Sequence, residues 1–217
     1  GTQAYEERNF METTVPPLSD LARLQPLFAA ATNEASGAMC CWTSGLITLS
    51  LDEVREVPLE MACHDFEIGE DLLTMVVLSL EGKLPGEMIL TFDEFNGRQL
   101  AATLLRQPQA SDGPWTELEQ SALCETGNIL GCAYLNALTR LIGAELKPSP
   151  PYFIQDFGAS VLQQAIAPQA ARSDRGLMCR TCFHRSGKNL DWSVFFVPGE
   201  ALRRRIETAL APRATEP

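Results

Sequence analysis

TELEQSALCETGNILGCAYLNALTRLIG, residues 116–143, has the periodicity of one long amphipathic helix. With 3.6 residues to a turn, the apolar side chains stack on one face, which we predict to be core: Leu123, Leu130, Ala137 and Leu141, flanked by Ala133 and Tyr134. Thr116 and Glu119 fit a capping box, in which the two side chains satisfy free N–H groups of the first turn. The stretch therefore predicts a helix from Thr116 to Ile142.

The opposite side of this helix is polar. Ser121, Glu125 and Asn128 fall within roughly 60° of one another, and Cys132 and Asn136 continue the same line. Such residues are most often only the solvent-facing side of a helix, so periodicity alone does not establish a functional site. A hydroxyl, a carboxylate and a carboxamide nevertheless share one outward face.

Two glycines, Gly127 and Gly131, lie on a third side of the helix. Each costs about 1 kcal/mol relative to alanine in a helix interior. We expect them to allow close backbone packing against another helix, in the first place the long helix of the N-terminal half.

Outward from this helix, the chain divides into two halves with the same order of elements, about 100 residues apart. The first half, residues 18–107, is predicted to contain a helix at 21–43, strand segments LITLSL (46–51) and VREVPLEMA (54–62), a hairpin at 72–92 and a helix at 93–105. The second half, residues 114–210, has the helix 116–142, a short strand at 144–148, an extra helix at 155–170, a hairpin at 177–197 and a last helix at 199–210. Pro26 is expected to kink the first helix or to mark its first turn.

The fold class that follows is α/β (α+β), a single domain over residues 18–210. Internally duplicated helix–hairpin–helix halves contribute one sheet packed against two long helices, because neither strand set alone covers both of its faces. Residues 1–17 are expected to form a flexible leader and 211–217 a tail.

The charge balance disfavours several classes of partner. The formal net charge is −11 and the isoelectric point about 4.7, so binding to nucleic acid or to an anionic membrane is not expected. No apolar run approaches the length of a membrane span, and the polar N-terminus does not have the pattern of a secretion signal. Seven scattered cysteines form no disulfide framework, which favours a cytoplasmic protein.

The pair Cys179 and Cys182, close to His184, has the spacing of a zinc or redox motif. A second pair at similar spacing is missing, and residues three apart on a strand point to opposite sides. We interpret both as strand thiols. His64 is interpreted as a loop or strand-edge residue rather than a base.

Ser121-xxx-Glu125-xx-Asn128, followed after twenty-two residues by Pro151, resembles the signature of the CheC-type chemotaxis phosphatases, whose relatives include CheX and FliY. The segment GNILGCAYLNALTRLIGAELKPSPP, residues 127–151, resembles the second active-site helix of that family and its exit. VREVPLE (54–60) and FFVPGEALRRRIETAL (195–210) extend the resemblance weakly across residues 18–210.

The resemblance implies a CheC-like fold and the dephosphorylation of a phospho-aspartyl response regulator of the CheY type. An acyl phosphate needs a water held in line rather than a nucleophile from this protein. Asn128 would orient that water, Glu125 would pair with the partner's active-site lysine, and Ser121 and Pro151 would support the docking. A divalent ion such as Mg²⁺ would belong to the receiver, so no metal or cofactor of this chain is expected.

The family that the chain resembles includes members with an active site on each of the two long helices. The first half of this chain departs from that pattern. At an offset of 99 residues, the positions of Ser121, Glu125, Asn128 and Pro151 are occupied by Ala22, Pro26, Ala29 and Asp52. We therefore expect one active site. Asn33 and Glu34 have the wrong order and spacing and are interpreted as a surface pair.

Two alternatives stay open. The chain would also suit a non-catalytic module that docks on a response regulator, a CheD-like partner or the flagellar switch. A FliY-like switch protein would carry a further C-terminal domain, which is not expected in a chain that ends at residue 217. The resemblance also allows a homodimer formed through the sheets.

Overall fold

The computed structural model describes residues 21–58, 61, 72–157, 160, 175–185 and 188–211. The predicted leader, His64, most of the predicted helix 155–170 and residues 186–187 of the predicted hairpin lie outside these residues.

The first helix begins where Pro26 allows it. A single 3-10 turn, Leu21–Arg23, leads into α1, Leu24–Trp42. Pro26 is the third residue of α1, in the first turn, where its missing N–H removes no helical hydrogen bond. Of the two outcomes expected for Pro26, a kink or a place in the first turn, the structure shows the second.

The strands of the described residues all join one antiparallel sheet. They are β1 (Thr48–Pro58), β2 (Leu72–Glu81), β3 (Gly86–Phe92), β4 (Lys147–Pro148), β5 (Tyr152–Phe157), β6 (Arg175–Arg185) and β7 (Lys188–Pro198). Their order is β1-β6-β7-β3-β2-β4, with β5 also beside β2.

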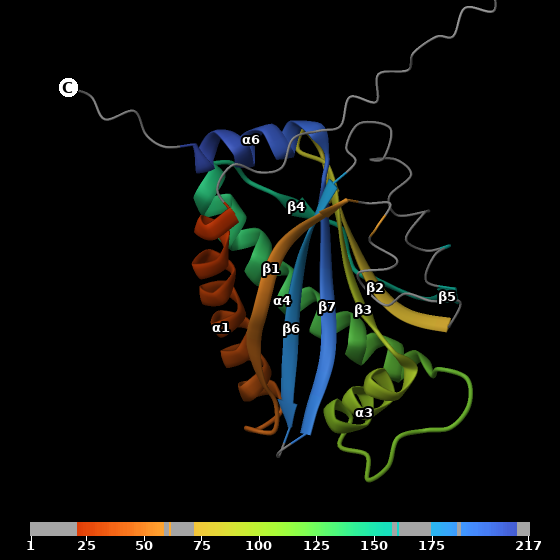
Figure 1. Cartoon of the computed structure of the whole chain (residues 1–217). Coiled ribbons are helices and arrows are strands. Elements are labelled where there is room, and N and C mark those ends of the chain that lie inside the picture. The colour runs from red at the N-terminus through yellow and green to blue at the C-terminus, as the bar shows by residue number, and fades with distance from the viewer. Residues whose placement is uncertain are drawn as a thin grey trace, which may run out of the picture.

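The two halves exchange their outer strands (Figure 1). The β1 strand of the first half pairs with β6 of the second, and β5 of the second half pairs with β2 of the first. The β3 and β7 strands meet in the middle. The duplicated order read from the sequence is thus confirmed as a symmetric strand order.

Three sequence expectations need correction. LITLSL and VREVPLEMA belong largely to one strand, β1, which has an irregularity between Leu51 and Glu53. The predicted helix 155–170 is wrong at its start: residues 155–157 continue β5, because the β-favouring run Tyr152–Ile154 pairs with β2. The strand expected at 144–148 is only Lys147–Pro148.

The long helices α1 and α4 (Glu117–Ile142) cover one face of the sheet, and α3 (Glu94–Leu104) and α6 (Glu200–Leu210) lie at its opposite ends (Figure 1). The rings of Phe28 on α1 and Tyr134 on α4 meet edge to face at 5.1 Å. The Tyr134 hydroxyl hydrogen-bonds Thr32 at 2.9 Å and Thr181 of β6 at 2.8 Å. One buried hydroxyl chain therefore joins both long helices to the sheet.

The other face of the sheet carries a second apolar cluster of fully buried side chains: Val57, Met75, Val77, Ile89, Met178, Phe195 and Val197. The central strands are apolar on both faces, and so they appear in the sequence as continuous apolar runs rather than as alternation.

An ion cluster fixes α6 to the sheet. Arg203 of α6 donates to the buried Glu56 carboxylate of β1 at 2.6 Å, and Arg175 of β6 lies 3.4 Å from the same carboxylate. Within the described part of the chain, no helix is long and apolar enough to cross a bilayer.

Candidate functional site

The helix α4 has the start that the sequence predicts. Thr116 is the N-cap: its hydroxyl accepts from the Glu119 N–H at 3.3 Å, and the Glu119 carboxylate accepts from the Thr116 N–H at 2.9 Å. At the other end, Gly143 takes a left-handed conformation with a φ of 64°. Local interactions at its two ends thus determine where α4 begins and ends.

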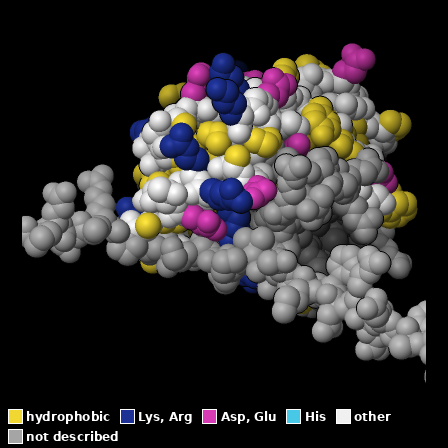
Figure 2. Space-filling view, turned by 90° about the horizontal axis from the view of Figure 1, so that it is seen from above, with side chains coloured by type: hydrophobic (Ala, Val, Ile, Leu, Met, Phe, Trp, Pro, Cys, Tyr) yellow, Lys and Arg dark blue, Asp and Glu magenta, His cyan; other side chains and the backbone are white. Residues whose placement is uncertain are grey.

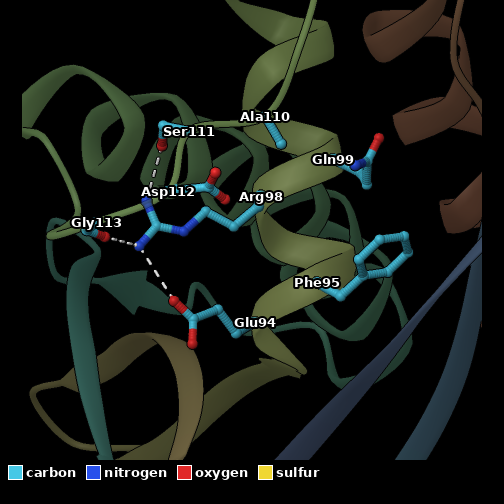
Figure 3. A pocket seen from close by; sticks show the side chains of 8 residues that line it. All are labelled: Glu94, Phe95, Arg98, Gln99, Ala110, Ser111, Asp112 and Gly113. Atoms are coloured by element: carbon cyan, nitrogen blue, oxygen red, sulfur yellow. Dashed lines mark hydrogen bonds and ion pairs between the residues drawn. The ribbon is translucent and has the colours of Figure 1, made fainter.

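A buried arginine joins this helix start to α3. Arg98 donates to Ser111 at 2.9 Å, to Glu94 at 3.1 Å and to the Gly113 carbonyl, as Figure 3 shows. It also lies 3.5 Å from the Glu119 carboxylate, and its guanidinium carbon is 3.9 Å from the centre of the Trp115 ring.

Arg98 lines a hollow of about 600 Å³ together with Glu94, Phe95, Gln99 and residues 110–113. Because its guanidinium is engaged by the chain's own oxygens, the hollow offers no free cation from Arg98. We assign the network a structural role: it holds the loop before α4 against α3.

Burial raises the pKa of Glu119, but hydrogen bonds from Ser111 and Thr116 and the charge of Arg98 outweigh it, so the pKa is lowered. Glu119 therefore stays ionised at neutral pH. Sequence reasoning identified Glu119 only as a capping residue; it gave no signal for Arg98, which lies 21 positions away in the chain.

The outward face of α4 presents the three residues of the motif together. Ser121 and Glu125 are exposed, and Asn128 is half-buried one turn further along. Cys132, half-buried, and Asn136, exposed, continue the line. At the start of α4, Leu118 is 61% exposed on the same side. The structure thus brings a carboxylate and a carboxamide onto an accessible surface.

Asn128 has a neighbour of its own on this face. The Cys132 thiol donates to the Asn128 side-chain oxygen, with 3.5 Å between Sγ and Oδ1. Burial and the negative charge of Glu125 both raise the pKa of Cys132.

The two glycines of α4 face the sheet, not α1, which corrects the expectation from the sequence. A Cβ at Gly127 would lie 2.6 Å from Cγ1 of Val76, and one at Gly131 would lie 3.1 Å from the Leu78 side chain. The glycines allow α4 to lie directly on β2, because the sheet needs the space that a methyl group would take.

Pro151 lies on a different element from the other motif residues. It is half-buried and directly precedes Tyr152, which pairs with Val77 of β2. The neighbours of Val77 on β2 are the residues that Gly127 and Gly131 approach. Pro151 is therefore at the sheet edge, alongside the middle of α4.

The matching positions of the first half lack these groups. Pro26 and Ala29 occupy α1, and Asp52 lies at the irregularity of β1. Glu34 is exposed and forms an ion pair with Arg140 of α4 at 3.3 Å, in agreement with the interpretation of Asn33 and Glu34 as surface residues.

The cysteines of β6 are strand residues, as interpreted from the sequence, and the structure shows that both are buried. Cys179 points into the helix-side core, and burial raises the pKa of its thiol. Cys182 is also buried, three residues further along the strand. Among the residues that the structure describes, no group of three or more metal-ligating side chains comes together.

A second hollow, of about 390 Å³, lies near α6 and the C-terminal end of α4. Its cations, Lys83, Lys147 and Arg205, are accompanied by Glu81 and Glu145. Figure 2, which views the α6 end from above, shows basic and acidic side chains close together. The two carboxylates offset two of the three cations, and cations near the C-terminal end of α4 complement its free carbonyls.

Comparisons with known proteins point to one group. No protein-family model matches the chain. The chain is 24% identical over 183 residues to CheC1 of Halobacterium salinarum, whose name describes it as a candidate CheY-P phosphatase; the match covers 82% of this chain and 91% of that protein. It is 32% identical over 105 residues to the CheY-P phosphatase CheC of Bacillus subtilis, covering 47% of this chain and 50% of that protein.

The fold is shared with solved chemotaxis and flagellar proteins. FliY of Thermotoga maritima superposes with a TM-score of 0.70 at 15% identity, over 89% of this chain and 97% of that one. The FliM middle domain of Helicobacter pylori gives a TM-score of 0.62 at 12% identity, over 90% and 98%. The sequence matches therefore show a similarity to CheC-type chemotaxis proteins, and the superpositions show that the chain shares the fold of FliY and the FliM middle domain.

Proposed function

We propose that this protein accelerates the dephosphorylation of a phospho-aspartyl response regulator of the CheY type, with a single active site on α4. One observation carries the proposal: Glu125 and Asn128 stand one turn apart on the accessible face of α4. The relatives named as CheY-P phosphatases support the same activity.

The proposed hydrolysis requires this chain mainly to position a water molecule. Hydrolysis of an acyl phosphate requires a water in line with the bond that breaks, and the charge of the transition state is neutralised by groups of the receiver. The Asn128 carboxamide has an acceptor and a donor, so it can hold and orient that water. The phosphorus atom is the electrophile, and a receiver-bound divalent ion such as Mg²⁺ would neutralise the charge on the phosphoryl oxygens.

Glu125 would fix the docking. An exposed carboxylate one turn from Asn128 can pair with a lysine at the receiver's phosphorylation site and set the distance of the carboxamide from the phosphoryl group. Ser121, one turn further toward the N-terminus, would lie at the edge of the contact, and Pro151 would shape the sheet edge beside it. Because the chain carries a net charge of −11, long-range attraction to an acidic receiver would contribute little.

The test is the rate of phosphate release from a phosphorylated receiver, with and without this protein. Asn128→Ala should reduce the rate to that of the receiver alone, whereas Glu125→Ala should raise KM about tenfold by weakening docking. Asn136→Ala is the matched control, because it removes an exposed carboxamide from the same face outside the motif. A fully active Asn128→Ala variant would exclude the assigned site.

A non-catalytic docking role is the alternative, and the same experiment separates it. A chain of the solved FliG–FliM complex of Helicobacter pylori shares the fold, with a TM-score of 0.59 at 11% identity over 82% of this chain and 95% of that one. If the wild-type protein binds a receiver without changing the rate of phosphate loss, docking is the function and the phosphatase proposal fails. Binding of a CheD-like partner and formation of a homodimer are further proposals for titration and sedimentation.

A further inference from the structure

Cys132 contacts the side chain of Asn128 from the next turn of α4. Its Sγ lies 3.5 Å from Oδ1 of Asn128, within the range of a thiol hydrogen bond. Helical side chains lean toward the N-terminus, so the residue at i+4 lies over residue i. The contact is therefore a consequence of helix geometry at these two positions.

The thiol selects one orientation of the carboxamide. The last side-chain torsion of asparagine is broad and nearly twofold, so an unrestrained carboxamide exchanges the places of its oxygen and nitrogen readily. The thiol donates to the oxygen in the observed orientation, whereas in the reversed one the NH₂ group meets only a weak sulfur acceptor, so the observed orientation is favoured. With Oδ1 turned toward Cys132, the direction of Nδ2 is fixed as well, because the carboxamide is planar.

The thiol remains a donor at neutral pH. Burial and the nearby charge of Glu125 raise the pKa of Cys132, and so the sulfur keeps its proton. Serine would not replace it, because its shorter side chain in a helix bonds back to the carbonyl four residues earlier.

We propose that Cys132 is a positioning residue for Asn128, which sets the direction in which the carboxamide meets the attacking water. The catalytic part of this inference rests on the proposed function. The contact itself is a property of the free protein and can be tested without a receiver.

The test compares Cys132→Ala with Cys124→Ala. Cys124 is a half-buried cysteine of the same helix whose pKa is raised by burial alone, and it makes no hydrogen bond to Asn128. We expect Cys132→Ala to lower kcat roughly three- to tenfold at unchanged KM. Cys124→Ala should keep both constants.

The second readout is the ¹H–¹⁵N signal pair of the Asn128 side chain, assigned by its loss in Asn128→Ala. We expect this pair to shift or broaden in Cys132→Ala and to stay in place in Cys124→Ala. Cys132→Ser, which preserves most of the volume, should behave like Cys132→Ala, so a folding defect of one variant does not decide the outcome.

An unchanged kcat together with an unchanged Asn128 signal in Cys132→Ala overturns the inference. A fall in thermal stability with kcat unchanged also overturns it, because that outcome assigns Cys132 to packing. If the wild-type protein shows no phosphatase activity but the Asn128 signal moves only in the Cys132 variants, the proposed function fails while the contact stands.

Discussion

Glu119 has two structural roles at the start of α4. Its carboxylate completes the capping box with Thr116 and lies beside the buried guanidinium of Arg98. A buried arginine that loses an anionic partner keeps the cost of its desolvation. Glu119 thus links the stability of the α3–α4 junction to the helix that carries Glu125 and Asn128.

We expect Glu119→Ala to lower the free energy of unfolding by about 3 kcal/mol. The measurement is urea unfolding at neutral pH. The lowered pKa of Glu119 also makes its contribution depend on pH: it is fully present above the ordinary value of 4.5 and is lost as the pH falls through the lower native pKa. The difference between wild type and variant should therefore shrink below pH 4.5.

Glu117→Ala is the control for this prediction. Glu117 is exposed and also lies in the first turn of α4. Its negative charge interacts favourably with the positive end of the helix dipole, but among the residues that the structure describes it has no buried partner. Its loss should cost less than about 1 kcal/mol. Equal effects of the two substitutions would show that the Arg98 network adds nothing beyond the helix start.

Among the elements, α4 shows how close packing limits sequence. Alanine is the better helix former, yet a methyl group at Gly127 would lie 2.6 Å from Val76. We expect Gly127→Ala to destabilise the protein by about 1–3 kcal/mol, because overpacking outweighs the gain in helix propensity. Thermal or urea unfolding of the purified variant measures the change.

Gly37 on α1 provides the opposite case. A Cβ built there meets no heavy atom within 4 Å, so Gly37→Ala should stabilise by up to about 1 kcal/mol. If both substitutions changed stability in the same direction, the contact of α4 with β2 would not be the cause.

The helices were largely predictable because their signals are local. The capping box at Thr116, Pro26 in the first turn of α1 and the shared face of Ser121, Glu125 and Asn128 all follow from helix geometry. The sequence predicts a helix for the last three residues of β5, 155–157, because their strand character depends on pairing with residues 72–74 of β2, 81 to 85 positions away in the chain. The contact of Gly127 with Val76 and the pairing of Arg98 with Glu119 likewise depend on tertiary structure, so the sequence alone does not predict them.

For the whole molecule, the exchange of outer strands makes each half depend on the other. A first half alone would keep the pairing of β2 with β3. It would lose β6, which pairs with β1, and β5, which pairs with β2. We expect fragments 18–107 and 108–211 to lack cooperative unfolding separately and to regain it when mixed. Circular dichroism during thermal unfolding, of each fragment and of the mixture, tests this, and a cooperative transition in either fragment alone would contradict it.

The strand exchange also bears on inheritance. Pro26 and Ala29 show that the positions of the first half that match Glu125 and Asn128 have no carboxylate or carboxamide. Yet α4 packs on β2, which belongs to the first half, and β1 of the first half pairs with β6 of the second. If α4 carries the proposed site, selection on that site also acts on the first half: residues at its motif positions are free to vary, while its strands are not.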